Sequence, residues 1–264
     1  MKLCAIERGD TPLVIDIPHA GTYVPPEIAA RLTPAARALP DTDWHVEKLF
    51  AFARDVEATL LVATHSRYVV DLNRDPGGAA LYPGADNTEL CPTRTFGDEP
   101  IYARDGEPGA DEVAARRNEY FEPYHRLLAA EIERVRMRHG YAILLDGHSI
   151  RSHVSRFFAG RLPDLNLGTV DGARCTPSVQ NAAALVLAGA AGFSNIVNGR
   201  FKGGYVTRCY GVPARGVHAL QLETAQACYM DEAPPFQWDA ARAAALMALL
   251  EQLVAALLAT RPGR

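Results

Sequence analysis

The stretch YAILLDGHSI at 141–150 constrains the fold more than any other part of the chain. An unbroken apolar run that ends in glycine and polar residues is typical of a strand buried on both faces, and such strands occur in parallel sheets covered by helices. Ligands bind these sheets beyond the carboxyl ends of the strands. We therefore expect His148 at the edge of the sheet where ligands bind. Gly147 is expected to allow a sharp turn there, and Asp146 and Ser149 are expected to support the neighbouring residues.

A second stretch, LVIDIPHAG at 13–21, repeats this arrangement, because an apolar run again ends beside a histidine, His19. Strand and helix signals alternate along the chain, which predicts a single α/β domain over 1–264. The expected fold is a three-layer sandwich, with helices on both faces of a mostly parallel or mixed sheet. Strands are expected at 13–17, 59–63, 67–72, 141–145, 194–197 and 217–222, and helices at 42–57, 111–138, 177–190 and 237–260.

The composition excludes several classes of protein. The 264 residues are 48% hydrophobic, which is enough for a full core, and the net charge of −4 gives no basic surface for nucleic acid. We expect no membrane span, because charged and polar residues interrupt the longest apolar run, at 240–260. The start of the chain, MKLCAIERGD, lacks the apolar core of a signal peptide, and the five scattered cysteines form no CxxC pair. We therefore expect a cytoplasmic protein with reduced thiols.

Two histidines at strand ends indicate a metal site. Zinc in hydrolases binds three His or carboxylate ligands and keeps one position for water. His19 and His148 supply two ligands, and DTDWHVEKLF at 41–50 supplies the third from an expected helix that Asp41 or Thr42 can cap. Asp43 lies in its first turn, and Glu47, four residues further on the same face, is the alternative. A divalent metal, with Zn²⁺ as the expected ion, follows from this set, although a strand-end histidine can also be structural.

A base is also needed to take a proton from the attacking water, and a carboxylate commonly does so. The segment GVHALQLET predicts a strand that ends at Glu223. The alternation of side chains along this strand, together with its direction, places Glu223 at the same edge of the sheet as the two histidines. Asp146, two residues before His148, is suited to orient that ligand from behind. A salt-bridged acid at the sheet margin is the plainer interpretation of Glu223.

Cations and amides gather in two loops that we expect to line the pocket. Asn73 and Arg74 follow the expected strand in RYVVDLNRDP, and Arg200, Lys202 and Arg208 lie in the glycine-rich NGRFKGGYVTRCYG. Arginine binds carboxylates through two parallel hydrogen bonds, so this set predicts a small acidic substrate. A nucleotide is disfavoured, because neither GxxxxGK[ST] nor GxGxxG is present.

These residues belong to a longer series of motifs that resembles the N-formylglutamate amidohydrolase family, the deformylases that end one bacterial route of histidine degradation. The resemblance covers most of the chain, and the combination of motifs is highly specific although each motif alone is weak. The motifs are PHAG, DTDWHVEKL, RYVVDLNRDP, LYPG, ELCPT with GDEPIY, YFEPYH, DGHSIRS, FFAGRLPDLNLGT, GRFKGGYVTR and HALQLE.

The resemblance implies a metal-assisted amide hydrolase with a sheet related to that of zinc exopeptidases, which converts N-formyl-L-glutamate to formate and L-glutamate. It supports His19, Asp43 and His148 as metal ligands and Glu223 as the base, and Arg74 is expected to help stabilise the oxyanion. The sequence departs from the family pattern at Cys209, where the family usually has histidine. No catalytic role is therefore expected for that position.

Three other functions remain open. The same scaffold could hydrolyse another N-acyl amino acid or a cell-wall amide, and a pocket closed tightly over the acyl group would argue against this. Ser149 could be a nucleophile, but the GxSxG elbow that such a serine needs is absent. A non-catalytic sensor of an acidic metabolite would need the cations, but it would not need a base such as Glu223.

Overall fold

Seven strands form one mixed sheet in the computed structural model, which describes residues 2–81 and 83–262. Their order across the sheet is β1-β3-β2-β4-β7-β5-β6. The strands are β1 Cys4–Glu7, β2 Leu13–Ile17, β3 Thr59–Ala63, β4 Ala142–Ile150, β5 Leu165–Gly168, β6 Asn195–Val197 and β7 Val217–Ala225.

The four central strands, β3, β2, β4 and β7, are parallel to one another. Antiparallel strands flank them, since β1 pairs with β3 and β5 pairs with β7. The carboxyl ends of the four parallel strands therefore meet at one edge of the sheet. The segments that follow β2 and β3, and the last residues of β4 and β7, are brought together there.

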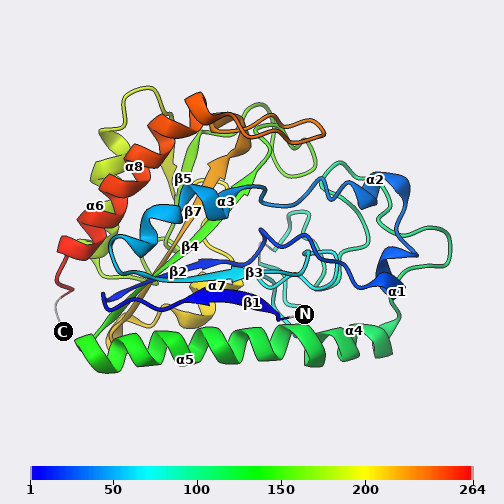
Figure 1. Ribbon diagram of the computed structural model, residues 1–264, viewed down its shortest axis with the longest axis horizontal. Coiled ribbons are helices and arrows are strands. Elements are labelled where there is room, and N and C mark those ends of the chain that lie inside the picture. Colours follow the sequence, from blue (N-terminus) through cyan, green and yellow to red (C-terminus); the bar gives the residue numbers. More distant parts are fainter. Residues whose placement is uncertain (1, 82, 263–264) are drawn as a thin grey trace.

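Helices cover both faces of this sheet (Figure 1). On one face, α6 (Pro177–Ala188) and α8 (Ala240–Ala259) pack on the odd-numbered residues of β2 and β4. On the other face, α5 (Glu122–His139) packs on the even-numbered residues of the same strands. The expected α/β architecture around a mixed sheet is confirmed.

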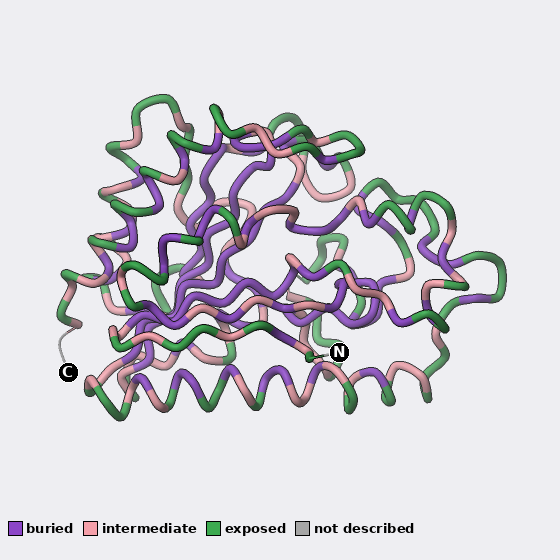
Figure 2. Tube along the Cα trace, viewed as in Figure 1, coloured by how far each residue is buried: buried purple, intermediate pink, exposed green. Residues whose placement is uncertain are grey.

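The shorter helices lie mainly in the connections between strands. They are α1 Pro26–Ala29, α2 Pro34–Arg37, α3 Val46–Leu49, α4 Ala110–Arg116 and α7 Tyr205–Tyr210, with the π-helical turn Arg117–Phe121 between α4 and α5 and 3₁₀ turns at Ala51–Arg54, Pro213–Arg215 and Gln226–Cys228. Every residue of β2, β4 and β7 is buried, which a strand covered on both faces requires (Figure 2).

Helix α8 is long and apolar enough to cross a membrane by length and composition, with a mean hydropathy of 1.7. Core helices of globular proteins meet the same test. Its leucines, from Leu246 to Leu257, pack into the core beneath α6, and the side that faces solvent carries mostly alanine with Glu251 and Gln252. The packing accounts for the hydropathy of this helix.

The helix expected at 42–57 is wrong. The chain forms only α3 and the following 3₁₀ turn, because His45 has a left-handed backbone with φ of 64° and interrupts any helix there. Asp41 and Thr42 therefore cap no helix, and Asp43 and Glu47 do not share a helical face. Gly140 ends α5 in a left-handed conformation, with φ of 81°.

The strand expected at 67–72 is also wrong, because this segment forms a turn and an extended loop without a ladder partner. Its apolar residues are buried in two different clusters, with Tyr68 and Val69 in one and Val70 and Leu72 in another. The strands β1 and β5 were not expected, and neither was α7.

Strand β4 runs through Gly147 to Ile150, so the sharp turn expected at this glycine is absent. The glycine instead makes room for a neighbour, since a Cβ atom at this position would lie 3.0 Å from the Phe50 ring. His148 is therefore held on a rigid strand.

Candidate active site

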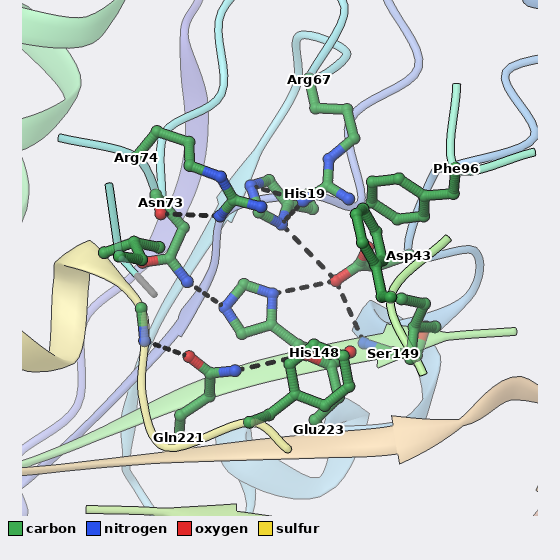
Figure 3. A pocket seen from close by; sticks show the side chains of 15 residues that line it. His19, Asp43, Arg67, Asn73, Arg74, Phe96, His148, Ser149, Gln221 and Glu223 are labelled. Atoms are coloured by element: carbon green, nitrogen blue, oxygen red, sulfur yellow. Dashed lines mark hydrogen bonds and ion pairs between the residues drawn. The ribbon is translucent and has the colours of Figure 1, made fainter. Parts of the chain in front are cut away.

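The register of the parallel strands brings His148 and Glu223 together, because these two residues are direct partners between β4 and β7. Two residues earlier on each strand, Asp146 pairs with Gln221. All four side chains are buried at the carboxyl edge of the sheet. They border a cavity of about 60 Å³ or lie directly behind it (Figure 3). The cavity is lined by His19, Asp43, Arg67, Asn73, Arg74, Leu81, Phe96, His148, Ser149, Ile150, Phe157, Phe201, Gly204, Gln221 and Glu223.

Three buried side chains form a group with the geometry of a metal site. One nitrogen or oxygen from each of His19, Asp43 and His148 lies within 4.8 Å of the others. Asp43 Oδ2 is 3.8 Å from His19 Nδ1 and 3.0 Å from His148 Nδ1. Ligands at about 2.1 Å from a tetrahedral zinc ion stand roughly 3.4 Å apart, so these residues fit such an ion with small adjustments. The structure brings Asp43, and not Glu47, to the two histidines.

The outer nitrogen of each histidine faces a carboxylate. His19 Nε2 lies 2.7 Å from Asp71 Oδ1, and His148 Nε2 lies 2.8 Å from Asp146 Oδ1. A carboxylate can only accept, so each Nε2 carries the proton that it donates. This arrangement directs both Nδ1 atoms to the centre of the group, and it is the usual support for histidines that bind metals.

The pKa values of the two imidazole rings are shifted in opposite directions. Burial and the neighbouring Arg67 guanidinium lower the pKa of His19 to about 4, so this ring is neutral. Burial also disfavours a charge on His148, but Asp146 and Asp43 outweigh it and hold the pKa of that ring well above its ordinary value. Without an ion, His148 is therefore an imidazolium between two carboxylates.

Glu223 lies beside this group without belonging to it. The carboxyl group is buried, and burial raises its pKa to about 8, opposed in part by the charge on His148. Its Oε2 accepts a hydrogen bond of 3.2 Å from Gln221 Nε2. A buried carboxylate with an elevated pKa, directed into a polar cavity, has the properties of a general base.

Two guanidinium groups border the cavity at different depths. Arg67 is 5% exposed, stacks 4.8 Å from the Phe96 ring centroid and donates from Nη2 to His19 Nδ1. Its Nε is buried and has no hydrogen-bond partner among the described residues. Arg74 lies nearer the surface, with 20% of its side chain exposed, and donates 2.7 Å from Nε to Thr88 Oγ1. The cavity therefore combines two fixed positive charges with the histidine and carboxylate group.

Comparisons with known proteins point to one enzyme family. The family model of N-formylglutamate amidohydrolase matches residues 11–230. The chain belongs to this family. It is 47% identical over 258 residues to N-formylglutamate deformylase of Pseudomonas aeruginosa, covering 98% of this chain and 97% of that protein, and 44% identical to the Pseudomonas putida protein of the same name, covering 98% and 96%. A crystal structure of N-formylglutamate amidohydrolase from Ralstonia eutropha JMP134 superposes with a TM-score of 0.80 at 29% identity, covering 97% of each chain.

In this amidohydrolase the other predicted cations lie away from the cavity lining. Arg200 Nε donates to the Phe157 carbonyl, Lys202 pairs with Asp171 at 3.0 Å, and Arg208 Nε donates to the Gly203 carbonyl. Their segment reaches the cavity through Phe201 and Gly204 instead. Of the four predicted cations, only Arg74 contributes to the lining.

Asn73 occupies the predicted place, but it acts mainly through other residues of the site. Its Nδ2 donates to Asp146 Oδ2 at 3.2 Å, and its Oδ1 accepts from the backbone N–H of Val206 at 2.8 Å. It therefore links the carboxylate behind His148 to the beginning of α7.

Ser149 and Cys209 take no part in a nucleophilic arrangement. Ser149 Oγ accepts from Tyr229 Oη at 2.7 Å, and the Ser149 backbone N–H donates to Asp43 Oδ2 at 3.0 Å. Cys209 is exposed on α7 outside the cavity lining. Ser149 thus helps to orient Asp43.

The sequence prediction missed two charged residues that contact His19, Arg67 and Asp71. Both lie in 67–72, which was interpreted as a strand. Two charged residues in a supposedly buried strand, in RYVVD, were the signal that could have revealed them.

Proposed function

We propose that this protein hydrolyses N-formyl-L-glutamate to formate and L-glutamate with the help of a divalent metal ion. The observation that carries the proposal is the convergence of His19, Asp43 and His148 at the sheet edge where Glu223 also ends. Membership of the amidohydrolase family and the names of its relatives support the same substrate.

The donor set suits zinc, because two imidazole nitrogens and one carboxylate oxygen leave one tetrahedral position open. When bound, the ion would polarise the formyl carbonyl and increase the acidity of a water molecule. Asp71 and Asp146 would hold the two rings in place by accepting from their Nε2 atoms. The same ligands can bind several divalent ions, and zinc is the ion that we propose.

Glu223 would take the proton from the attacking water as the hydroxide adds to the formyl carbon. It would then give this proton to the glutamate nitrogen as the C–N bond breaks, which releases formate and the amine. The elevated pKa of Glu223 favours this second role, since a carboxyl group that holds its proton near neutral pH can deliver it.

Arg67 and Arg74 would bind negative charge at two different depths of the cavity. Arg67 donates to His19 Nδ1, the nitrogen assigned to the metal, so its guanidinium would turn from this nitrogen when an ion binds and would stabilise the negative charge on the formyl oxygen. Arg74, nearer the mouth with 20% of its side chain exposed, would bind a substrate carboxylate through two hydrogen bonds. Arg200, Lys202 and Arg208 remain a prediction for the second carboxylate.

Bulky rings border the cavity, among them those of Phe96, Phe157 and Phe201, and they favour a small formyl group over a longer acyl chain. A cytoplasmic location fits the cysteines, because all five are free and four are buried.

The test combines metal analysis with an assay of formate release. The purified protein should contain about one metal ion per chain and should lose activity on chelation. N-formylglutamine should be a poorer substrate by about tenfold to a few hundredfold in kcat/KM, because its amide leaves a partly buried cation without a charged partner at a cost of about 1–3 kcal/mol. Full activity of metal-free protein, or faster turnover of N-acetylglutamate, would contradict the proposal.

A further inference from the structure

Gln221 is a buried residue whose chemistry the mechanism above does not use. It precedes Glu223 by two positions on β7, so both side chains point to the same face of the sheet. Gln221 is 4% exposed and lines the cavity (Figure 3). Both ends of this buried amide form hydrogen bonds with neighbouring residues.

The two ends of the Gln221 amide can be assigned from its partners. Its Oε1 accepts a hydrogen bond of 2.7 Å from the backbone N–H of Gly204, and a backbone N–H can only donate. The oxygen must therefore face Gly204. The NH₂ end then faces Glu223, where Nε2 lies 3.2 Å from Oε2. The amide thus gives a donor, and never an acceptor, to the carboxyl group of Glu223.

The Gly204 end of this bridge is itself fixed. A Cβ atom at position 204 would lie 2.4–2.6 Å from the side-chain amide of Asn73, so the backbone approaches as closely as it does because residue 204 is glycine. The next residues bond to Asn73 as well, since the N–H of Val206 donates to Asn73 Oδ1 at 2.8 Å. The beginning of α7 is thereby anchored on both sides.

We propose that Gln221 is the positioning residue of Glu223, which holds one carboxylate oxygen in a hydrogen bond and leaves the other to exchange a proton in the cavity. This inference rests on the proposed function. Because the amide donates to Oε2, the ionised form is stabilised at that oxygen and Oε1 is the oxygen that takes the proton from water and returns it to the leaving nitrogen. The same side chain couples the base to the segment 199–204, whose Phe201 and Gly204 border the cavity.

Two substitutions separate the two ends of the bridge. Gln221→Glu keeps an oxygen for the N–H of Gly204 but replaces the donor to Glu223 with a second carboxyl group. Gln221→Met has a similar length and removes both hydrogen bonds. Gln180→Met is the matched control, because Gln180 bonds to Thr169 through Oε1 at 2.5 Å, away from the cavity lining.

We expect kcat to fall about 10- to 100-fold in both Gln221 variants at an unchanged metal content, since small misplacements of a reacting group cost rates of this size. KM should rise only in Gln221→Met, in which the segment 199–204 loses its anchor. The acidic limb of the kcat profile should move to higher pH in both variants, and most in Gln221→Glu, because two neighbouring carboxyl groups share a proton. Gln180→Met should match the wild type in all three quantities.

Values of kcat within twofold of wild type, with an unmoved acidic limb, would overturn the inference even if both variants were less stable. Loss of metal from both variants would overturn it as well, because Gln221 would then act on the ligand group. An inactive wild-type enzyme would instead refute the proposed function, so the two failures are distinguishable.

Discussion

Asp43 and Glu223 are both buried carboxylates near the two histidines, but the structure gives them different partners. Asp43 Oδ2 faces His148 Nδ1 and the N–H of Ser149, whereas Glu223 bonds to Gln221. We expect Glu223→Gln to keep the metal and to lower kcat by roughly 10²–10⁴, since proton transfer is lost. Asp43→Asn should weaken metal retention, and excess metal should restore activity in part. Metal stoichiometry and kcat of both variants test this, and metal loss in Glu223→Gln would make Glu223 a ligand.

The proton on His148 predicts a pH-dependent affinity for the metal. Asp146 and Asp43 raise the pKa of this ring, so the metal-free protein holds a proton that must leave before Nδ1 can bind an ion. Affinity should therefore increase about tenfold per pH unit below that pKa and level off above it. Calorimetric titration with Zn²⁺ in two buffers of different ionisation enthalpy should show about one proton released at pH 7. Binding without proton release would contradict the assignment of His148.

The sequence predicted the site residues that stand at strand ends. His19, His148 and Glu223 each follow or end an apolar run, and parallel strands bring such positions to one edge. Arg67 and Asp71 could not be found in this way, because they act from a loop whose apolar residues imitate a strand. Arg200, Lys202 and Arg208 do not line the cavity, and their proximity to glycines in the sequence does not determine the direction of their side chains.

At the level of elements, the turn that follows β2 depends on Gly21. A Cβ atom at this position would lie 2.3 Å from the His65 backbone oxygen, and backbone atoms cannot move aside as a flexible side chain can. We expect Gly21→Ala to destabilise the fold by about 1–3 kcal/mol and to weaken metal binding, because His19 lies two residues away. Gly109→Ala is the control, as nothing lies within 4 Å of its Cβ position. Equal midpoints of urea unfolding for the two variants would show that the backbone of this turn can shift to accommodate a Cβ atom.

Long buried elements were predictable and short irregular ones were not. The strands at 13–17 and 217–222, and the helices at 177–190 and 237–260, have enough periodic residues to define their type, and the structure contains all four. The helix expected at 42–57 failed at His45, whose left-handed backbone is imposed by tertiary contacts, among them the bond of 2.8 Å between its Nε2 and the Phe236 carbonyl. That failure also explains why Asp43 is directed toward the histidines and Glu47 is not.

For the whole molecule, the proposed metal site joins segments that are far apart in sequence. His19 follows β2, Asp43 lies in the loop before α3 and His148 is in β4, so an ion bound here links three parts of the core. The unfolded chain cannot present these ligands together, and binding energy therefore adds to the stability of the folded state.

Metal removal should therefore lower the melting temperature of the entire protein. An ion present at about 1,000 times its Kd stabilises the folded state by ~4.1 kcal/mol, which corresponds to a shift on the order of 10 °C for a domain of this size. Thermal unfolding of the wild type with Zn²⁺ and with a chelator should show this difference. His148→Gln should show almost none, because it lacks one ligand while it keeps a polar side chain between Asp43 and Asp146. An equal shift in this variant would mean that the ion stabilises the protein from a different site.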